Sequence, residues 1–269
     1  MSAARERRLV AASWTALRRE PNHAAEQVSQ LLLGEAFDAD GADPAGEWLH
    51  GAGPDGYPGW LRAWHLAPAG EYTVAPDRVV VARCGRALAA PRPDAPLLAD
   101  LSFGTRLAAG SAVKGFVAWR LPDGRRAWTP AGELAPWPTP AASRRERVLA
   151  WAPALLEIPY EWGGRSCRGL DCSGLVQVLL GAAGQALPRD AALQAAGPGR
   201  SLDPGDPDAF RPGNLLCFGS GAVDHVAILA GPGRVLHASG SVRYEALADL
   251  RRRRGLLQVL DPFELISTT

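Results

Sequence analysis

The first half of the chain repeats itself with a period of about 70 residues. Each copy contains short runs rich in Val, Phe, Trp and Leu, separated by turn signals such as Asp55-Gly56 and Asp123-Gly124, a pattern typical of small antiparallel barrels. Because matching landmarks recur in order, a duplicated all-β unit is the simplest explanation. The landmarks, 70 residues apart for the first pair and 68 for the others, are Gly34 and Gly104, Trp60 and Trp128, and Leu66 and Leu134.

Proline-rich segments follow both copies. Proline disfavours continuous helix or sheet at residues 67–70 and 135–140, so these segments divide the chain into three parts. In the first part, the basic and apolar residues of Met1–Glu20 predict an amphipathic helix ahead of the strands. The three predicted domains are residues 1–68, 69–138 and 139–269.

The third part carries a mixed pattern. Apolar residues at helical spacing predict one helix over Arg144–Glu157 and another that begins near Cys172. Short apolar runs over residues 214–218, 223–230 and 234–238 predict strands after it. The whole chain is therefore expected to be α+β, with two small all-β barrels ahead of a mixed domain.

The composition excludes several function classes. With 29 basic and 28 acidic residues the net charge is +1, so no global field draws the chain to nucleic acid or an anionic membrane. The run Arg251–Arg254 is interpreted as a solvated face. No stretch approaches the roughly 20 apolar residues of a membrane span, and Met1–Glu20 lacks the cleavage site of a secretory signal. We therefore expect a cytoplasmic protein.

The four cysteines are too few and too irregularly spaced for a disulfide scaffold, and no two form a Cys-x-x-Cys zinc pair. We expect a reduced chain with no metal site and no cofactor. Cys217 lies in an apolar strand and is interpreted as a core residue. Cys167 lies in an arginine-rich loop in which no histidine is placed to activate it.

Cys172 differs from the other cysteines because it lies at the first turn of a predicted helix. The unpaired N–H groups and the positive end of the helix dipole favour thiolate over thiol there. The structural alternative is a small apolar residue that packs at the helix start. Two histidines favour the reactive interpretation.

His225 and His237 flank a predicted hairpin whose turn contains Gly231-Pro232-Gly233. If the hairpin is centred on Gly231, the two histidines lie directly opposite each other on one face, where one imidazole can orient the other. Together with Cys172 they form a candidate nucleophile, base and orienting residue. A one-residue slip in the register would turn His237 to the other face.

Five short motifs surround the candidate catalytic residues. They are Tyr-Glu-Trp-Gly-Gly at 160–164, Asp-Cys-Ser-Gly at 171–174, Leu-Pro-Arg-Asp-Ala at 187–191, Gly-Asn-Leu-Leu-Cys-Phe-Gly at 213–219 and Val-Asp-His-Val-Ala-Ile at 223–228. Through these motifs residues 140–265 resemble the NlpC-type papain-like cysteine peptidases of the cell-wall hydrolase family, although Asn214 stands where aspartate is usual. The two repeated copies resemble bacterial SH3-like domains. The resemblance implies a papain-like catalytic domain preceded by two SH3-like barrels.

The resemblance implies a catalytic role for four residues. Cys172 attacks an amide carbonyl, His225 takes and returns the proton, and His237 fixes the tautomer of His225. The backbone N–H of Cys172 and the hydroxyl of Tyr160 stabilise the oxyanion, an effect worth roughly 3–4 kcal/mol per donor.

The chain also looks like the subgroup that cleaves γ-D-glutamyl-L-diamino acid bonds in murein peptides with a free N-terminal L-alanine. Asp171 and Asp190 are expected to receive the substrate ammonium, although helix and loop caps are the structural alternatives. Ala191 stands where the subgroup often has serine. The predicted substrate-binding residues are Asp171, Ser173, Asp190, Ala191, Tyr57 and Glu26.

The sequence is also compatible with two alternatives to a murein endopeptidase. Related folds use the same catalytic set in amidases and acyltransferases that act on other amides. A non-enzymatic murein-binding protein, in which the third domain only supports the SH3-like pair, is the second alternative. The complete set of Cys172, His225 and His237 argues against the second.

Overall fold

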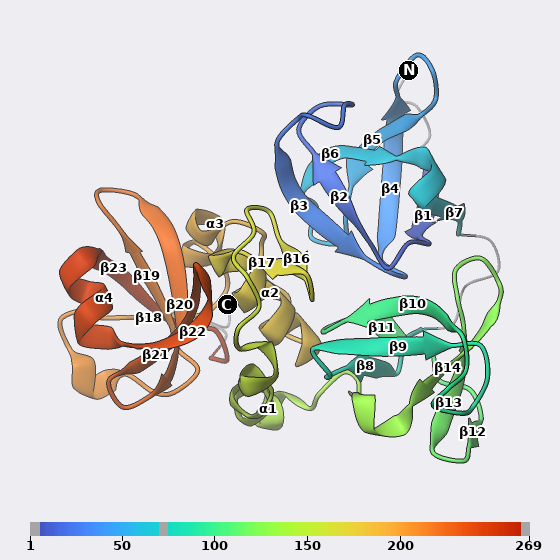
Figure 1. Ribbon diagram of the computed structural model, residues 1–269. Coiled ribbons are helices and arrows are strands. Elements are labelled where there is room, and N and C mark those ends of the chain that lie inside the picture. The colour runs from blue at the N-terminus through green and yellow to red at the C-terminus, as the bar shows by residue number, and fades with distance from the viewer. Residues whose placement is uncertain (1–5, 70–74, 265–269) are drawn as a thin grey trace, which may run out of the picture. The chain divides into compact units, whose positions relative to one another are not determined.

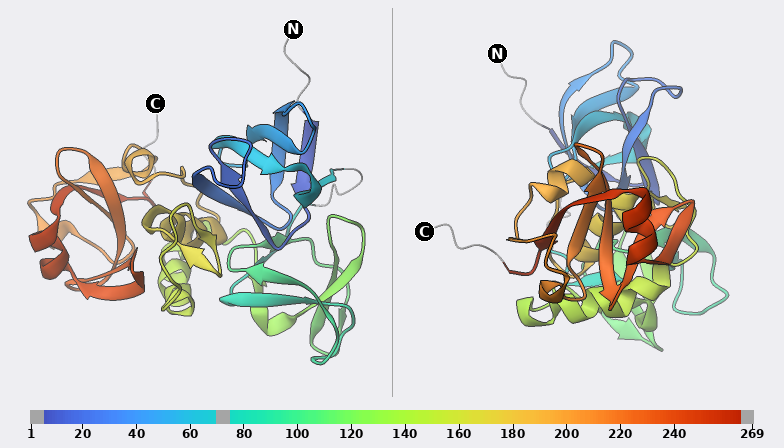
Figure 2. Two further views of the ribbon diagram at one scale, coloured as in Figure 1. Left: turned by 45° about the horizontal axis from the view of Figure 1, so that its top comes forward. Right: turned by 90° about the vertical axis from the view of Figure 1, so that its left-hand side faces the viewer.

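The computed structural model describes residues 6–69 and 75–264 (Figures 1 and 2). The chain forms two compact units. One unit comprises residues up to Pro138 together with the short segment Arg165–Cys167, and the other comprises Thr139–Gly164 and the residues from Arg168 onward. Within the described ranges, no helix is both long and apolar enough to cross a bilayer. The three-domain division stays a prediction.

The first copy of the repeat forms one antiparallel sheet in the order β3-β2-β6-β5-β4-β1-β7. Apolar side chains that include Leu17, Phe37 and Leu61 fill its interior. β1 pairs with both β4 and β7, so the sheet curls back on itself. Its strands are β1 (Glu6–Val10), β2 (Trp14–Arg18), β3 (Gln27–Leu32), β4 (Ala36–Ala42), β5 (Trp48–Ala52), β6 (Pro58–Arg62) and β7 (Leu66–Pro68).

The predicted N-terminal helix is wrong over its described part. Residues 6–10 and 14–18 are strands β1 and β2, and Met1–Arg5 lie outside the described residues. In β2 the buried residues Thr15 and Leu17 alternate with the half-buried Trp14 and Ala16, which is the period of a strand. Pairing of β2 with β3 supplies backbone hydrogen bonds that outweigh local helix propensity.

The second copy forms a five-stranded sheet, β10-β9-β14-β13-β12, and a three-stranded sheet, β11-β8-β15. Its apolar core includes Leu101, Leu107 and Trp119. Its strands are β8 (Arg78–Val80), β9 (Cys84–Leu88), β10 (Leu97–Ser102), β11 (Arg106–Leu107), β12 (Ala112–Val113), β13 (Phe116–Arg120), β14 (Arg126–Pro130) and β15 (Leu134–Pro136).

The two copies share local structures at the repeated positions. Gly34 and Gly104 both adopt positive φ, of 82° and 87°, a conformation that favours glycine. Each copy ends in a 3₁₀ turn and a short strand: η1 (Ala63–His65) precedes β7 as η2 (Ala131–Glu133) precedes β15. These shared local structures support the predicted repeat.

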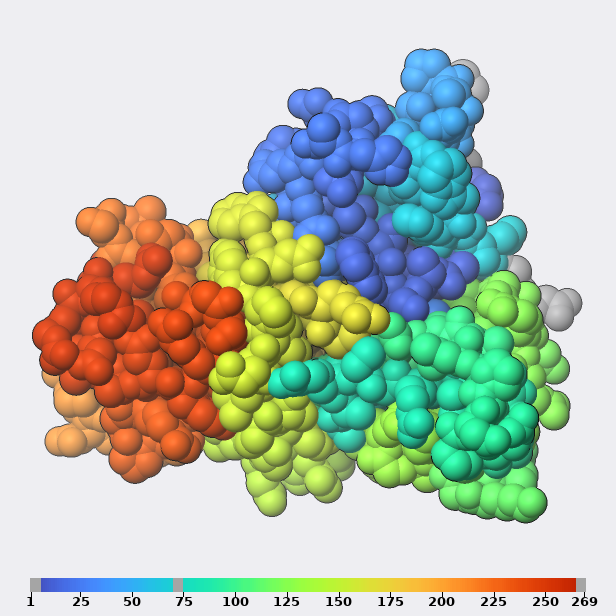
Figure 3. Space-filling model, in the orientation of Figure 1, coloured from blue at the N-terminus to red at the C-terminus, as the bar shows by residue number. Residues whose placement is uncertain are grey.

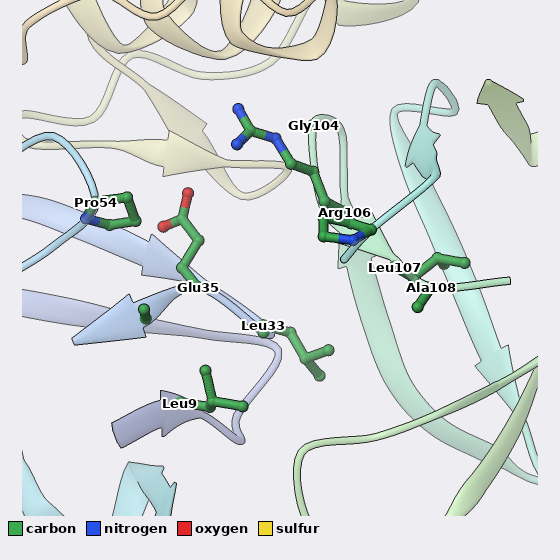
Figure 4. A pocket seen from close by; sticks show the side chains of 11 residues that line it. Leu9, Leu33, Glu35, Pro54, Gly104, Arg106, Leu107 and Ala108 are labelled. Atoms are coloured by element: carbon green, nitrogen blue, oxygen red, sulfur yellow. The ribbon is translucent and has the colours of Figure 1, made fainter. Parts of the chain in front are cut away.

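A pocket in this first unit is lined by both copies. Leu9 and Leu33 from the first copy and Leu107 from the second form part of its apolar wall. The side chains of Glu35 and Arg106 extend in the same direction from this wall (Figure 4). Burial lowers the pKa of Arg106, although the nearby Glu35 carboxylate opposes that effect.

The second unit contains a six-stranded antiparallel sheet in the order β18-β23-β19-β20-β21-β22. Its apolar core includes Leu216, Phe218 and Val235. The strands are β18 (Arg200–Leu202), β19 (Leu215–Gly219), β20 (Val223–Gly231), β21 (Arg234–Ser239), β22 (Ser241–Ala246) and β23 (Gly255–Asp261). Two-residue strands β16 (Arg165–Ser166) and β17 (Gly169–Leu170) precede this sheet in the chain.

Helices complete the second unit. The predicted helix over Arg144–Glu157 is shorter than expected, because Pro153 lies in the 3₁₀ turn η4 (Ala152–Leu155) that follows α1 (Arg144–Trp151). α2 contacts both β20 and β21, and α4 lies at the surface of this unit (Figure 3). The remaining elements are α2 (Cys172–Ala182), α3 (Ala191–Ala195), α4 (Leu247–Arg253), η3 (Ala141–Ser143) and η5 (Pro207–Ala209).

Candidate active site

Asp171 is the N-cap of α2, as the structural alternative predicts. Its Oδ1 accepts a hydrogen bond from the N–H of Gly174 at 2.6 Å, and its Oδ2 accepts one from the N–H of Gly163 at 2.9 Å. Arg189 approaches both oxygens, with Nη1 at 3.0 Å and Nη2 at 2.6 Å. Both residues are buried. The carboxylate therefore fixes the start of α2, and both of its oxygens already have donors within the protein.

Cys172 is the first residue of α2 and is only 8% exposed. Burial and the negative charge of Asp171 raise its pKa, and this outweighs the backbone N–H groups of Val226 and Ser173, which lower it. The expectation that the helix start favours thiolate is therefore wrong for the resting site. The hydrogen-bond donors at the helix start are present, but desolvation of the charged form is the larger effect.

His225 lies on β20 next to Val226, whose backbone N–H reaches the Cys172 thiol. Its Nε2 lies 2.9 Å from Nδ1 of His237 on β21, and the two rings meet edge to face. Both histidines are buried. The predicted contact between the two imidazoles is therefore present, and the cysteine lies beside the same strand.

The predicted register of this hairpin is wrong by two residues. Ile228 pairs with Leu236 rather than with Arg234, and the pairing is irregular between Leu229 and Gly231. A shift of two residues returns each side chain to the same face. The two histidines are therefore diagonal neighbours rather than directly opposite, and their rings still reach each other.

Glu245 on β22 extends this chain of contacts and was not among the residues predicted from the sequence. Its Oε2 lies 3.1 Å from Nε2 of His237. β21 and β22 pair so that Val235 faces Glu245 and His237 faces Arg243, which places Glu245 diagonally beside His237. The turn at Ser239-Gly240-Ser241 and the two-residue strand period were the signals that could have located it.

The carboxylate determines which nitrogens carry protons. Salt bridges to Arg253 and Arg243 surround Glu245. Burial raises the pKa of this carboxyl, but the hydrogen bonds from Arg253 and Arg243 and the positive charge of Arg253 outweigh burial and lower it. An ionised carboxylate only accepts hydrogen bonds. His237 therefore donates from Nε2 and accepts at Nδ1, so His225 donates from Nε2. This leaves Nδ1 of His225 as the proton acceptor.

The histidine pair is neutral at rest. Burial lowers the pKa of His225 to about 3, and the positive potential of His237 and Arg254 acts in the same direction. Burial also lowers the pKa of His237, against the opposing effect of Glu245. A neutral imidazole beside a protonated thiol is the resting arrangement of a base that takes its proton during attack.

Tyr160 lies in the same unit, where its backbone N–H donates to the carbonyl of Gly240 at the β21–β22 turn. Burial raises the pKa of its hydroxyl to about 12, and the charges of Cys172 and Asp171 add to the effect. The side chain is 37% exposed. It is therefore a protonated hydroxyl within electrostatic range of the thiol.

Three predicted substrate-binding residues lie on or beside α2 and α3. Ser173 is buried, and its hydroxyl accepts from Arg189 at 2.9 Å and donates to Asp171 at 3.2 Å. Asp190 occupies the N-cap position of α3 without a side-chain cap and is half-buried. Ala191 begins α3 and is buried.

The other two predicted substrate-binding residues belong to the first unit. Tyr57 packs against the core of the first copy of the repeat, and its backbone N–H donates to Asp55 at 3.1 Å. Glu26 accepts a hydrogen bond from Arg19 at 2.7 Å. Their contact with substrate stays a prediction.

Two family models match the chain. Residues 157–258 match the NlpC/P60 family. Residues 17–66 match the bacterial dipeptidyl-peptidase SH3 domain. The first range contains Cys172, His225, His237 and Glu245, and the second contains Tyr57.

Two curated relatives are similar over most of the chain, and a third is similar over less than half of it. A γ-D-glutamyl-L-lysine dipeptidyl-peptidase of Bacillus cereus is 28% identical over 80% of this chain and 68% of its own length. The protein of the same name from Bacillus subtilis is 30% identical over 69% of this chain and 61% of its own length. The peptidoglycan endopeptidase RipB of Mycobacterium tuberculosis is 31% identical over 40% of this chain and 48% of its own length.

Solved structures share the fold. An NlpC/P60 family protein from Bacillus cereus superposes with a TM-score of 0.83 over 96% of this chain and 99% of that one, at 21% identity. An NlpC/P60 endopeptidase from Photobacterium damselae gives a TM-score of 0.68 over 96% of this chain and 73% of that one, at 16% identity. The α+β architecture with antiparallel sheets ahead of the catalytic domain is therefore confirmed.

Proposed function

Because this chain belongs to the NlpC/P60 family through residues 157–258, we propose that it is a cysteine peptidase that hydrolyses murein stem peptides at the γ-D-glutamyl-diaminoacyl bond. The observation that carries the proposal is the line of contacts from Glu245 through His237 to His225, with the Cys172 thiol beside the same strand. This line supplies a nucleophile and an oriented base at one place.

The reaction begins with a neutral His225 imidazole and a protonated Cys172 thiol. Nδ1 of His225 takes the thiol proton as the Cys172 sulfur attacks the amide carbonyl, so the thiolate forms only as it reacts. The imidazolium returns the proton to the leaving amine, and a thioester remains on Cys172. Water, deprotonated by the same Nδ1, hydrolyses the thioester and frees the thiol.

The oxyanion forms at the N-terminus of α2. The backbone N–H of Cys172 lies at the first turn, where helix N–H groups lack intrahelical partners. The protonated hydroxyl of Tyr160 is the second donor that we assign. Each donor of this kind contributes about 3–4 kcal/mol to the stabilisation of the transition state.

The names of similar proteins support the proposed substrate class. Two of them are named γ-D-glutamyl-L-lysine dipeptidyl-peptidases, and a shorter match is named a peptidoglycan endopeptidase. We assign recognition of a free N-terminal L-alanine to Asp190, which is half-buried at the start of α3. Asp171 contributes indirectly, because its two oxygens hold α2 and Arg189.

The nucleophile is tested with two matched variants. Cys172→Ala should reduce turnover of L-Ala-γ-D-Glu-diaminopimelate to background, whereas Cys217→Ala should keep it, because Cys217 is fully buried in β19 and its pKa is raised to about 12 by burial. Products are identified by mass spectrometry. Retained turnover in Cys172→Ala would refute the proposal.

Substrate specificity requires a separate test. The free tripeptide and its N-acetylated form should differ by at least about tenfold in kcat/KM, because one lost charge-assisted hydrogen bond in a half-buried site costs roughly 1.5–3 kcal/mol. Asp190→Asn should reduce the difference. Equal rates on both peptides would leave a cysteine peptidase without the proposed requirement for a free amino terminus.

A further inference from the structure

Cys84 and Cys167 lie with their Sγ atoms 2.9 Å apart in the first unit, although 82 residues separate them in the sequence. Cys84 begins β9 and is exposed, and Cys167 follows β16 and is partly exposed. A disulfide places its sulfur atoms about 2.05 Å apart. Only a small side-chain movement therefore separates the two thiols from bonding distance.

Backbone contacts hold the two cysteines in this arrangement. The N–H of Cys167 donates to Oγ of Ser102 at 3.1 Å, and Ser102 is the cross-strand partner of Cys84 in the β9–β10 ladder. Ser102 therefore contacts both cysteines: it accepts a hydrogen bond from Cys167 and is the strand partner of Cys84.

The segment that carries Cys167 is anchored a second time. Arg165 donates from its backbone N–H to Oε1 of Gln30 at 2.9 Å and from Nη1 to the carbonyl of Gln30 at 2.6 Å. Its guanidinium also pairs with both oxygens of Glu35 at 3.0 Å. With contacts on either side of Ser166, the position of Cys167 does not depend on one flexible side chain.

We propose that Cys84 and Cys167 are a redox-active dithiol that closes to an intrachain disulfide, separate from the nucleophilic thiol. Both are more accessible than the other two cysteines, since Cys172 is 8% exposed and Cys217 is fully buried. A solution oxidant therefore reaches the dithiol first. The sequence predicted that all four cysteines are reduced. We now expect Cys84 and Cys167 to form a disulfide under oxidising conditions.

The oxidant is a low-molecular-weight disulfide. The thiolate of one cysteine attacks a sulfur of this disulfide, forms a mixed disulfide and releases one thiolate of the reagent. The thiolate of the second cysteine attacks the protein sulfur of the mixed disulfide and releases the other. In sum, two protein thiols are oxidised and one small disulfide is reduced to two thiols, with the two protons passing to the released thiolates.

The disulfide has a structural consequence. It links β9 covalently to the segment five residues before Cys172, and it closes a loop of more than 80 residues. A cross-link that spans a long loop restricts the unfolded chain. The oxidised protein should therefore unfold at a higher urea concentration than the reduced protein, with the Cys172 thiol still present.

Oxidised glutathione tests the proposal on the full-length chain. After treatment, the protein should lose the mass of two hydrogen atoms and keep two alkylatable cysteines after denaturation. A non-reduced peptic map should join the peptides that contain Cys84 and Cys167, and dithiothreitol should reverse the change. In Cys84→Ser, a stable glutathione adduct should remain on Cys167, whereas Cys217→Ser should behave as the wild type.

Three results would overturn the proposal. They are four alkylatable cysteines after treatment of the wild type, stable glutathione adducts on Cys84 and Cys167 without a link between them, and a link that includes Cys172 or Cys217. All are read by mass on the wild-type chain, so they do not depend on the folding of a variant. None uses peptidase activity, so this test is independent of the proposed function.

Discussion

Asp171 and Glu245 are carboxylates at opposite ends of the candidate active site, one beside the thiol and the other behind the histidine pair. Asp171 is bound by Arg189, which is 1% exposed, and by two backbone N–H groups. Glu245 is bound by the exposed arginines 243 and 253 and by His237. Asp171 is therefore needed to build the start of α2, whereas Glu245 determines which nitrogens of the catalytic histidines carry protons.

The largest expected effect is on the buried pair. Arg189→Met leaves the Asp171 carboxylate buried without its counter-ion, and this should lower the free energy of unfolding by about 3–5 kcal/mol. Urea unfolding followed by fluorescence measures it. Arg200→Met is the matched control, because its ion pair with Glu264 is more than half exposed. A loss no greater than that of the control would show that Asp171 does not need Arg189.

The next effect is on activity rather than stability. Glu245→Gln keeps the shape of the side chain but removes the charge that selects the His237 tautomer, so kcat should fall roughly tenfold to hundredfold with little change in KM. Steady-state kinetics on the murein tripeptide measure this effect. Asp249→Asn, which changes a half-exposed carboxylate on α4 that pairs with Arg252, should leave both constants unchanged. An unaltered kcat in Glu245→Gln would show that Glu245 does not select the His237 tautomer during catalysis.

The buried histidine pair should also make the free energy of unfolding depend on pH. Because the pKa of His225 is about 3 in the folded state against 6.5 when unperturbed, the unfolded state binds the proton first as pH falls. The free energy of unfolding therefore rises with pH between about 3 and 6.5, by up to ~1.4 kcal/mol per pH unit. Urea unfolding between pH 5 and 7 tests this, and His225→Gln should flatten the slope. The same slope in the variant would assign the dependence to other groups.

The smallest effect is expected from the arginines around Glu245. Arg253→Ala removes one partner of the carboxylate while Arg243 remains. Because the Arg253 side chain is more than half exposed, its ion pair should contribute no more than about 1 kcal/mol, so kcat should fall by no more than about fivefold. Arg252→Ala is the control, because Arg252 pairs with Asp249 instead. A decrease as large as that of Glu245→Gln would mean that Arg253 alone keeps Glu245 ionised.

Several features could be predicted from local sequence. The start of α2 at Cys172 and the three strands that follow the helices were found because period and turn chemistry repeat within short windows. The N-terminal helix was predicted wrongly, because the apolar residues in the short run from Leu9 to Leu17 fit both the 3.6-residue period of a helix and the two-residue period of a strand. These residues form strands because β1 pairs with β7 and β2 pairs with β3. A short sequence window around residues 9–17 does not contain those partners.

Local spacing was enough to predict the duplicated β unit, the cysteine at a helix start and the two histidines on one face, because each depends on one or two neighbouring elements. Tertiary contacts were needed to establish the two-residue shift of the hairpin, the contact of Glu245 with His237, the pairing of Asp171 with Arg189 and the approach of Cys84 to Cys167. Burial likewise reversed the expected ionisation of Cys172. Desolvation and contacts between distant segments depend on which surfaces meet, and that is fixed only when the chain is folded.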